Sequence, residues 1–183
     1  MNFEFFSSGI NKILSNAGLE FVIYDQEHSN ISYEQLKTLS LSDEILPITR
    51  VPALEYHLIT KSLDAGVKGI MCPKIETKHQ AEKLVEYCKY RPNGKRGLAF
   101  GIAHDSYDRF SKNDNNNISF TNIKSKMKSL NESILVIPLI ETELGIRNCE
   151  EIIAVPGIDM AWLGHYDLTD SMKIVGEFEN KKF

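Results

Sequence analysis

The sequence lacks a long hydrophobic run and has only three cysteines among its 183 residues. No apolar stretch approaches the roughly 20 residues that span a bilayer. The N-terminus carries neither a basic leader nor a sustained apolar segment, so we expect no membrane span and no signal peptide. Cys72, Cys88 and Cys149 are odd in number and form no C-x-x-C pair. This pattern favours free thiols packed in the core of a cytoplasmic protein.

The chain also lacks an excess of charge of either sign. Its 21 basic and 25 acidic residues are well mixed and give a formal net charge of -4. A sequence without a basic patch has no electrostatic footprint for nucleic acid or an anionic membrane surface. The length and the 42% hydrophobic content predict one domain, residues 1–183, with a single sizeable core.

What the sequence does have is a repeated pattern of glycine, apolar run and polar loop. Gly18, Gly66 and Gly157 each precede an apolar run that ends in acidic or imidazole side chains. A glycine after a helix commonly caps it in a left-handed conformation. Short continuous apolar runs are typical of strands buried on both faces of a parallel sheet. Ligands bind at the carboxyl ends of such strands.

The pattern predicts an α/β fold built from right-handed βαβ units. Two helices begin with capping-box spacing, Ser32 with Gln35 and Thr77 with Gln80. An eight-stranded barrel typically needs about 250 residues. The length of this chain is therefore compatible with an open doubly wound sheet or with a barrel that lacks some of its parts. The long stretch 90–132 breaks the pattern: residues 113–117 are typical of a surface insertion, whereas 94–104 suits a functional loop equally well. The six expected strands are Phe3–Phe6, Phe21–Asp25, Leu46–Arg50, Gly69–Cys72, Ile134–Ile140 and Ile158–Leu163.

Acidic, basic and imidazole side chains follow these strands. Carboxylates that converge from separate strands favour an Mg²⁺ or Mn²⁺ site. A histidine adds a base that titrates near neutral pH, and an arginine can stabilise an oxyanion. The set indicates proton abstraction or carbon–carbon cleavage beside a metal-bound carbonyl. The residues are Asp25, Glu27, His28, Arg50, Glu76, Glu141, His165 and Asp167.

Each of these residues also has a structural interpretation. Asp25 and Asp167 could cap the helices that follow them, Glu27 could be a solvated loop acid, and Arg50 could pair with a neighbouring acid. Glu76 and the second glutamate of the set stand in the same Ile-Glu-Thr tripeptide, so the residues alone do not separate them. We further expect His57 and His79 to be solvated on helices, His104 to be able to reach a substrate, and Trp162 to lie in the core.

Six motifs, in this order, resemble the HpcH/HpaI aldolase family of class II, metal-dependent pyruvate aldolases. They are YDQEH, ITRVP, LDAGVKGIMCP, YRPNGKRG, IETELGIRN and GHYDLTDSMKIVG. The resemblance implies a (β/α)8 TIM-type barrel of the phosphoenolpyruvate/pyruvate type, usually assembled as a hexamer. The chain ends shortly after the sixth expected strand. The resemblance therefore predicts an incomplete barrel that lacks the last two βα units.

The resemblance also implies residue roles. Glu141 and Asp167 match the ligands of a divalent metal, Mg²⁺, Mn²⁺ or Co²⁺, and this favours Glu141 over Glu76. His28 matches the catalytic base, and Asp64 matches the carboxylate that orients it.

Two further roles concern the substrate. Arg50 matches the arginine that holds the pyruvyl oxygen and stabilises the enolate. Backbone N–H groups around Tyr166 and Asp167 match the site for the substrate carboxylate. One position departs from the pattern: Leu139 stands where the family usually has a glutamine near metal and substrate, which we expect to weaken binding.

The implied activity is cleavage of a 2-keto-3-deoxy or 4-hydroxy-2-oxo acid to pyruvate and an aldehyde through a metal-bound pyruvate enolate. Two alternatives stand beside it. One is a truncated, non-catalytic relative of the family. The other is a citrate-lyase-type lyase that acts on an acyl-CoA ester; the D-x-E-H and G-x-x-D-L motifs favour the aldolase.

Overall fold

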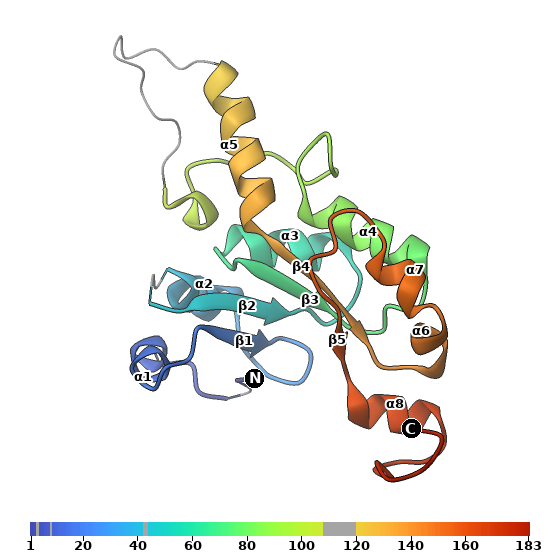
Figure 1. The fold of residues 1–183 in the computed structure, drawn as a ribbon. Coiled ribbons are helices and arrows are strands. Elements are labelled where there is room, and N and C mark those ends of the chain that lie inside the picture. Colours follow the sequence, from blue (N-terminus) through green and yellow to red (C-terminus); the bar gives the residue numbers. More distant parts are fainter. Residues whose placement is uncertain (3, 8, 42–43, 108–119) are drawn as a thin grey trace.

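The computed structural model describes residues 1–2, 4–7, 9–41, 44–107 and 120–183 (Figure 1). Strands and helices alternate along most of the chain, as the sequence predicts. The strands are β1 (Phe21–Asp25), β2 (Leu46–Arg50), β3 (Gly69–Cys72), β4 (Leu135–Ile140) and β5 (Trp162–Leu163). The helices are α1 (Ile10–Asn16), α2 (Tyr33–Ser40), α3 (Tyr56–Asp64), α4 (Lys78–Cys88), the 3-10 helix η1 (Ala103–Asp105), α5 (Phe120–Ser133), α6 (Glu143–Arg147), α7 (Cys149–Ile153) and α8 (His165–Ser171).

The five strands found in the described residues form one sheet in the order β1-β2-β3-β4-β5, and every pair is parallel. Asp25 of β1 lies opposite Arg50 of β2, and Leu139 of β4 lies opposite Trp162 of β5. Strands that pair in chain order, each followed by a helix, build a barrel wall rather than a doubly wound sheet. The fold is thus an α/β half-barrel with a five-stranded parallel sheet (Figure 1).

The two faces of the sheet are packed differently. On the outer face, Val22, Tyr24 and Val136 share one core cluster with helix residues such as Leu36 and Leu84. The inner face carries a separate, smaller cluster made of Ile23, Ile48, Met71, Ile137 and Leu139. Because successive side chains of a strand point to opposite faces, each strand contributes to both clusters.

Local sequence features produce the element boundaries. Both predicted capping boxes are confirmed. The hydroxyls of Ser32 and Thr77 accept the backbone N–H of Gln35 and Gln80, respectively, and each glutamine Oε1 accepts the backbone N–H of its Ser or Thr partner. Gly66 follows α3 with φ +108°, a left-handed conformation that a side chain would strain. Within the described residues, no helix has both the length and the apolar character that a membrane crossing requires.

Two of the expected strands differ from the observed ones. Ile158–Leu163 is reduced to the two residues of β5. Of the expected strand at 3–6, residue 3 lies outside the described residues and 4–6 are not a strand. Asn2 makes a single parallel bridge to β1, and its side-chain oxygen then accepts the N–H groups of Glu4 and Phe5. These local bonds compete with strand pairing and turn the chain away from the sheet.

Candidate active site

The inner face of the sheet changes from apolar to charged at the carboxyl ends of its strands. Ile23, Ile48 and Leu139 belong to the buried inner cluster. Two residues further along each strand stand Asp25, Arg50 and Glu141, respectively. The period of two places each charged side chain on the same face as the apolar one before it. The three charged residues are buried, at 0%, 7% and 3% exposure.

Asp25 and Arg50 form a two-bonded ion pair. Arg50 Nε donates to Asp25 Oδ1 at 2.8 Å, and Nη2 donates to Oδ2 at 2.5 Å. Burial by itself would raise the pKa of the Asp25 carboxyl, but the bonds from Arg50 and from the backbone N–H of Glu27 outweigh it and lower the pKa. The carboxylate therefore stays ionised and holds the guanidinium in one orientation.

Glu27 extends this pair toward His28. Its backbone N–H donates to Asp25 Oδ1 at 2.9 Å. Its Oε2 lies 3.3 Å from Arg50 Nη1 and 3.9 Å from His28 Nε2. That oxygen is buried and has no hydrogen-bond partner, whereas the His28 side chain is 62% exposed. Glu27 is thus a partly buried member of the cluster and not a solvated loop acid.

Glu141 lies across from this cluster, directly after β4. Its Oε1 accepts the backbone N–H of Lys74 at 2.9 Å. Burial raises the pKa of the Glu141 carboxyl; the Lys74 bond and Arg50 oppose this, and the negative charges of Asp167 and Glu27 add to it. These interactions bring together four of the site residues predicted from the sequence: Glu27, Arg50, Glu141 and Asp167.

Gly164 allows the turn between β5 and α8 to approach Glu141. A Cβ atom at Gly164 would lie 2.8 Å from both the Cβ and the Oε2 of Glu141, closer than real contacts allow. A larger residue at this position would therefore displace the glutamate. The close turn carries α8, and with it Asp167 and Tyr166, to the carboxyl end of the sheet; both side chains are exposed.

The two glutamates that the sequence left equivalent have different surroundings. Glu76 Oε1 accepts the hydroxyl of Thr142 at 2.8 Å, and its backbone carbonyl accepts the side-chain amide of Asn148 at 2.7 Å. Glu76 thus ties two loops together. Glu141 shares its surroundings with Asp167 instead.

Asp64 and His104 lie away from the site. Asp64 ends α3 and accepts Arg96 Nη2 at 2.8 Å. A helix between parallel strands runs back along the sheet, so its last residue lies at the amino edge of the next strand, opposite the edge that carries His28. His104 is buried at the same amino edge, where its backbone carbonyl accepts the ammonium of Lys68, just before β3. The structure therefore does not bring Asp64 beside His28, and the expectation that His104 reaches the site is wrong.

The cluster suits a small divalent cation. Three carboxylates, those of Asp25, Glu27 and Glu141, gather around one buried guanidinium, and Glu27 Oε2 lacks a donor. In the described part of the chain, no three His, Cys, Asp or Glu side chains are grouped closely enough to hold a metal alone. Mg²⁺ commonly uses one or two carboxylate ligands and takes the others from water and substrate, so the carboxylates present fit such an ion.

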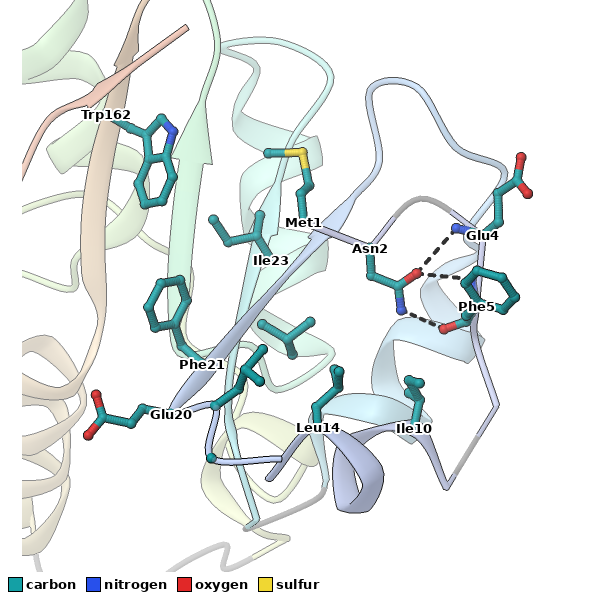
Figure 2. A pocket seen from close by; sticks show the side chains of 13 residues that line it. Met1, Asn2, Glu4, Phe5, Ile10, Leu14, Glu20, Phe21, Ile23 and Trp162 are labelled. Carbon is teal, nitrogen blue, oxygen red and sulfur yellow. Dashed lines mark hydrogen bonds between the residues drawn. The ribbon is translucent and has the colours of Figure 1, made fainter. Parts of the chain in front are cut away.

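A separate cavity lies at the other end of β1 (Figure 2). It has a volume of about 840 Å³ and is bordered by the N-terminal segment, Phe21, Ile23 and Trp162. None of the charged residues of the site lines it, so the cavity is not the candidate active site. Trp162, expected in the core, is 39% exposed, because it lies at the edge strand where this cavity opens.

Sequence reasoning did not identify Lys74 as part of the site. It contributes a backbone N–H rather than a side chain, from a turn in which its φ is 55°. Only the preceding Pro73 marks a turn there, and no sequence pattern indicates which carboxylate the turn would meet.

Comparisons with known proteins identify relatives of this chain. The family model described as HpcH/HpaI aldolase/citrate lyase matches residues 6–182. The chain is 30% identical to a hydroxypyruvate/pyruvate aldolase of Roseobacter denitrificans, with 91% of this chain and 61% of the relative aligned. It is 31% identical to a 2-dehydro-3,6-dideoxy-6-sulfogluconate aldolase of Pseudomonas putida, with 93% and 63% aligned. The chain thus spans about six tenths of the length of these relatives.

Solved structures of this kind of protein have a similar fold. A citrate synthase, SbnG, is 28% identical with a TM-score of 0.80, over 97% of this chain and 64% of that one. An HpcH/HpaI aldolase from Desulfitobacterium hafniense DCB-2 has a TM-score of 0.85 at 24% identity and supports the fold, with 98% of this chain and 66% of that one covered. The chain belongs to the HpcH/HpaI aldolase/citrate lyase family.

Proposed function

We propose that this protein is an aldolase-type carbon–carbon lyase that cleaves a 2-keto-3-deoxy or 4-hydroxy-2-oxo acid to pyruvate and an aldehyde with the help of a divalent metal. The observation that carries the proposal is the group of charged side chains at the carboxyl ends of the strands, next to the apolar inner face. There, the locked Asp25–Arg50 pair lies beside Glu27 and His28, and Glu141 shares its electrostatic surroundings with Asp167. The names of the aldolase relatives support the same reaction class.

Arg50 is suited to stabilise negative charge that develops on the pyruvyl oxygen. Its Nε and Nη2 are held by Asp25, so the guanidinium is oriented before substrate arrives. A fixed, buried cation costs little reorganisation when charge appears, which is the main requirement for lowering the barrier. Its Nη1 lies 3.3 Å from Glu27 Oε2, a longer distance than those from Nε and Nη2 to Asp25.

His28 is suited to move the proton. The imidazole takes the proton of the substrate's C4 hydroxyl, and the O–H electrons become the C=O bond of the aldehyde. The C3–C4 bond breaks, its electrons form the enolate of pyruvate, and C3 then takes a proton from the imidazolium or from water. His28 lies on the rim with an exposed side chain, within reach of solvent and of an entering substrate.

Glu141 and Asp167 are the residues that would hold a divalent cation. When bound, such an ion supplies Lewis-acid polarisation of a carbonyl oxygen. The backbone N–H groups of Tyr166 and Asp167 lie in the first turn of α8, where a carboxylate is favoured by the helix dipole.

Pyruvate release from a 4-hydroxy-2-oxo acid in the presence of Mg²⁺ or Mn²⁺ tests the proposal. We expect His28→Ala to lower kcat by roughly 10²–10⁴-fold, and Arg50→Lys to lower it by roughly 10²–10³-fold because the two-bonded pair is lost. His79→Ala is the control, since His79 is exposed on α4 and its ion-pair partner is Glu82, which is not a residue of the site. Unchanged pyruvate release in His28→Ala would show that another group is the base.

The truncated, non-catalytic alternative gives a different result in the same assay. A wild-type chain that is folded by circular dichroism, yet releases no pyruvate and gains no thermal stability from Mn²⁺ with oxalate, would support it. Ligand that binds the folded state must raise the unfolding temperature by mass action.

A citrate-lyase-type activity is the second candidate. It is favoured by the family description and by the likeness to the citrate synthase structure. An assay for acyl-CoA consumption or release distinguishes the two, because the aldolase reaction needs no thioester.

A further inference from the structure

A groove lies between α4 and α5, apart from the candidate active site. It has a volume of about 1150 Å³ and is bordered by the end of α4, residues 91–93, α5 and the turn at residues 156–157. None of the charged residues of the candidate site lines it. We propose that this α4–α5 groove binds a small molecule in which an apolar body carries a dianionic head, such as a phosphate monoester.

The two sides of the groove are held in place by the fold. α5 rises from β4 beside the segment that follows α4 (Figure 1), and Lys89 Nζ donates to the backbone carbonyl of Asn131 at 2.6 Å. The Asn131 side chain also accepts the backbone N–H of Tyr90 and donates to its carbonyl. The turn at Gly157 lies so close to α4 that a Cβ atom there would be 2.8 Å from Val85 Cγ1. The groove is thus formed before a ligand arrives, as most small-molecule sites are.

The interior of the groove is apolar. Val85 of α4 is buried, and Ile123 and Met127, one helical turn apart on α5, are half-buried. A membrane surface would need apolar side chains that project outward, whereas these line a hollow. The volume lies slightly above the range of about 300–1,000 Å³ that is typical of small-molecule sites. The groove therefore has room for an apolar ring or chain of drug-like size.

The rim of the groove is positively charged. Arg91 lies on one side, Lys124 and Lys128 lie on α5, and all three are exposed. Glu132 is the acid among the lining residues, and its carboxylate lies 3.8 Å from Lys128 Nζ. Neither Arg91 nor Lys124 has an ion-pair partner among the described residues.

The charge of the rim indicates the charge of the ligand. Three exposed cations and one acid leave an excess of two positive charges, on a chain whose formal net charge is -4. A phosphate monoester carries close to two negative charges at neutral pH, and arginine and lysine are the side chains that bind phosphate in proteins. An apolar interior below such a rim fits a ligand with both features.

Isothermal titration calorimetry with 1-naphthyl phosphate tests the proposal, because this probe joins a rigid apolar ring to a phosphate monoester. We expect one molecule to bind per chain, with an affinity that falls as salt is added. Inorganic phosphate lacks the apolar body and 1-naphthol lacks the charge, so each should bind roughly tenfold more weakly or less. The double variant Lys124→Gln, Lys128→Gln should weaken binding of the probe by roughly 3–20-fold. Lys83→Gln is the matched control, since Lys83 is exposed on α4 and does not line the groove.

Three results would overturn the proposal. The first is a folded wild type that does not bind the probe, or a double variant that binds it as tightly as the wild type does. The second is binding of an acidic amphipathic peptide, or of phosphatidylcholine vesicles with phosphatidylglycerol, by a protein that does not bind the probe; the groove would then belong to a macromolecular or membrane partner. The third is displacement of the probe by oxalate with Mn²⁺, which would place it in the candidate active site. None of these measurements depends on lyase activity, so the proposal stands or falls separately from the proposed function.

Discussion

At the scale of single residues, His104 is a buried imidazole held in its neutral form. It is 2% exposed, and its Nε2 lies 3.1 Å from the hydroxyl of Tyr90. Burial, and then the positive charge of Arg96, lower the pKa of His104 from 6.5 to about 4. The side chain is thus part of the packing at the amino edge and not a proton carrier.

A pH-dependent stability follows from this lowered pKa. The unfolded chain binds a proton at His104 near pH 6.5, whereas the folded chain does so only near pH 4. The stabilising contribution is therefore complete above about pH 6.5 and is lost progressively as the pH falls from 6.5 to about 4. Urea unfolding at pH 7 and pH 4.5 should show a loss of roughly 1–3 kcal/mol attributable to His104. In His104→Gln this part of the loss disappears; His57→Gln, at an exposed position on α3, should behave like the wild type. Identical pH slopes in His104→Gln and wild type would contradict the assignment.

The residue-level predictions from sequence succeeded where the strand period determines the position. Asp25, Arg50 and Glu141 were expected at the carboxyl ends of parallel strands, and all three lie there. The distinction between Glu76 and Glu141 was not visible from the residues alone, because identical tripeptides gain their roles from partners far away in the chain. Asp64 illustrates the same limit, since its partner Arg96 comes from a later loop.

At the scale of elements, the best-predicted features are those that depend on local bonding. The capping box at Thr77 needs only Gln80, three residues away, and both bonds are present. The apolar face of α4, formed by Ala81, Leu84, Val85 and Cys88, is buried as its spacing predicts.

Loss of this cap should destabilise the protein measurably. We expect Thr77→Ala to lower the free energy of unfolding by about 1 kcal/mol, because the backbone N–H of Gln80 loses its acceptor. Thr38→Ala is the matched control: Thr38 is exposed inside α2 and bonds only to the carbonyl of Glu34, so its loss should stay within about 0.5 kcal/mol. Denaturant unfolding measures both. Equal losses in the two variants would show that the capping bond does not stabilise α4.

The less well-predicted elements are those at the edges of the sheet. Residues 3–6 were expected as a strand, but 4–6 are not one, and the backbone N–H groups of Glu4 and Phe5 donate to the Asn2 side chain. Residues 158–161 were expected to belong to the last strand, yet pairing begins only at Trp162. Hydrophobic pattern identifies apolar segments but not whether a neighbouring strand is there to pair with them.

At the scale of the whole molecule, the half-barrel has one face covered by helices and one that opens to a cavity. The helices α2, α3, α4 and α7 pack side by side in succession on the outer face. The inner face is closed by its own apolar cluster near the site but remains open beside Phe21 and Trp162 (Figure 2). The candidate site therefore lies next to the buried apolar cluster of the inner face and not next to the cavity.

The single tryptophan reports on this open face. Because Trp162 is 39% exposed and borders the cavity of about 840 Å³, we expect its fluorescence to be quenched readily by acrylamide and its emission maximum to lie toward that of a solvated indole. Trp162→Phe supplies the baseline from tyrosine. A blue-shifted emission that is protected from acrylamide would contradict an open cavity in solution.

Titration of the protein with Mn²⁺, by calorimetry or by the electron paramagnetic resonance of the free ion, tests most directly whether Glu141 and Asp167 form a metal site. The wild type should bind one ion per chain, and Glu141→Gln and Asp167→Asn should each weaken binding by roughly tenfold or more. Glu150→Gln, at an exposed position on α7, should bind as the wild type does. Wild-type affinity in both Glu141→Gln and Asp167→Asn would contradict a metal site at the carboxyl edge of this sheet.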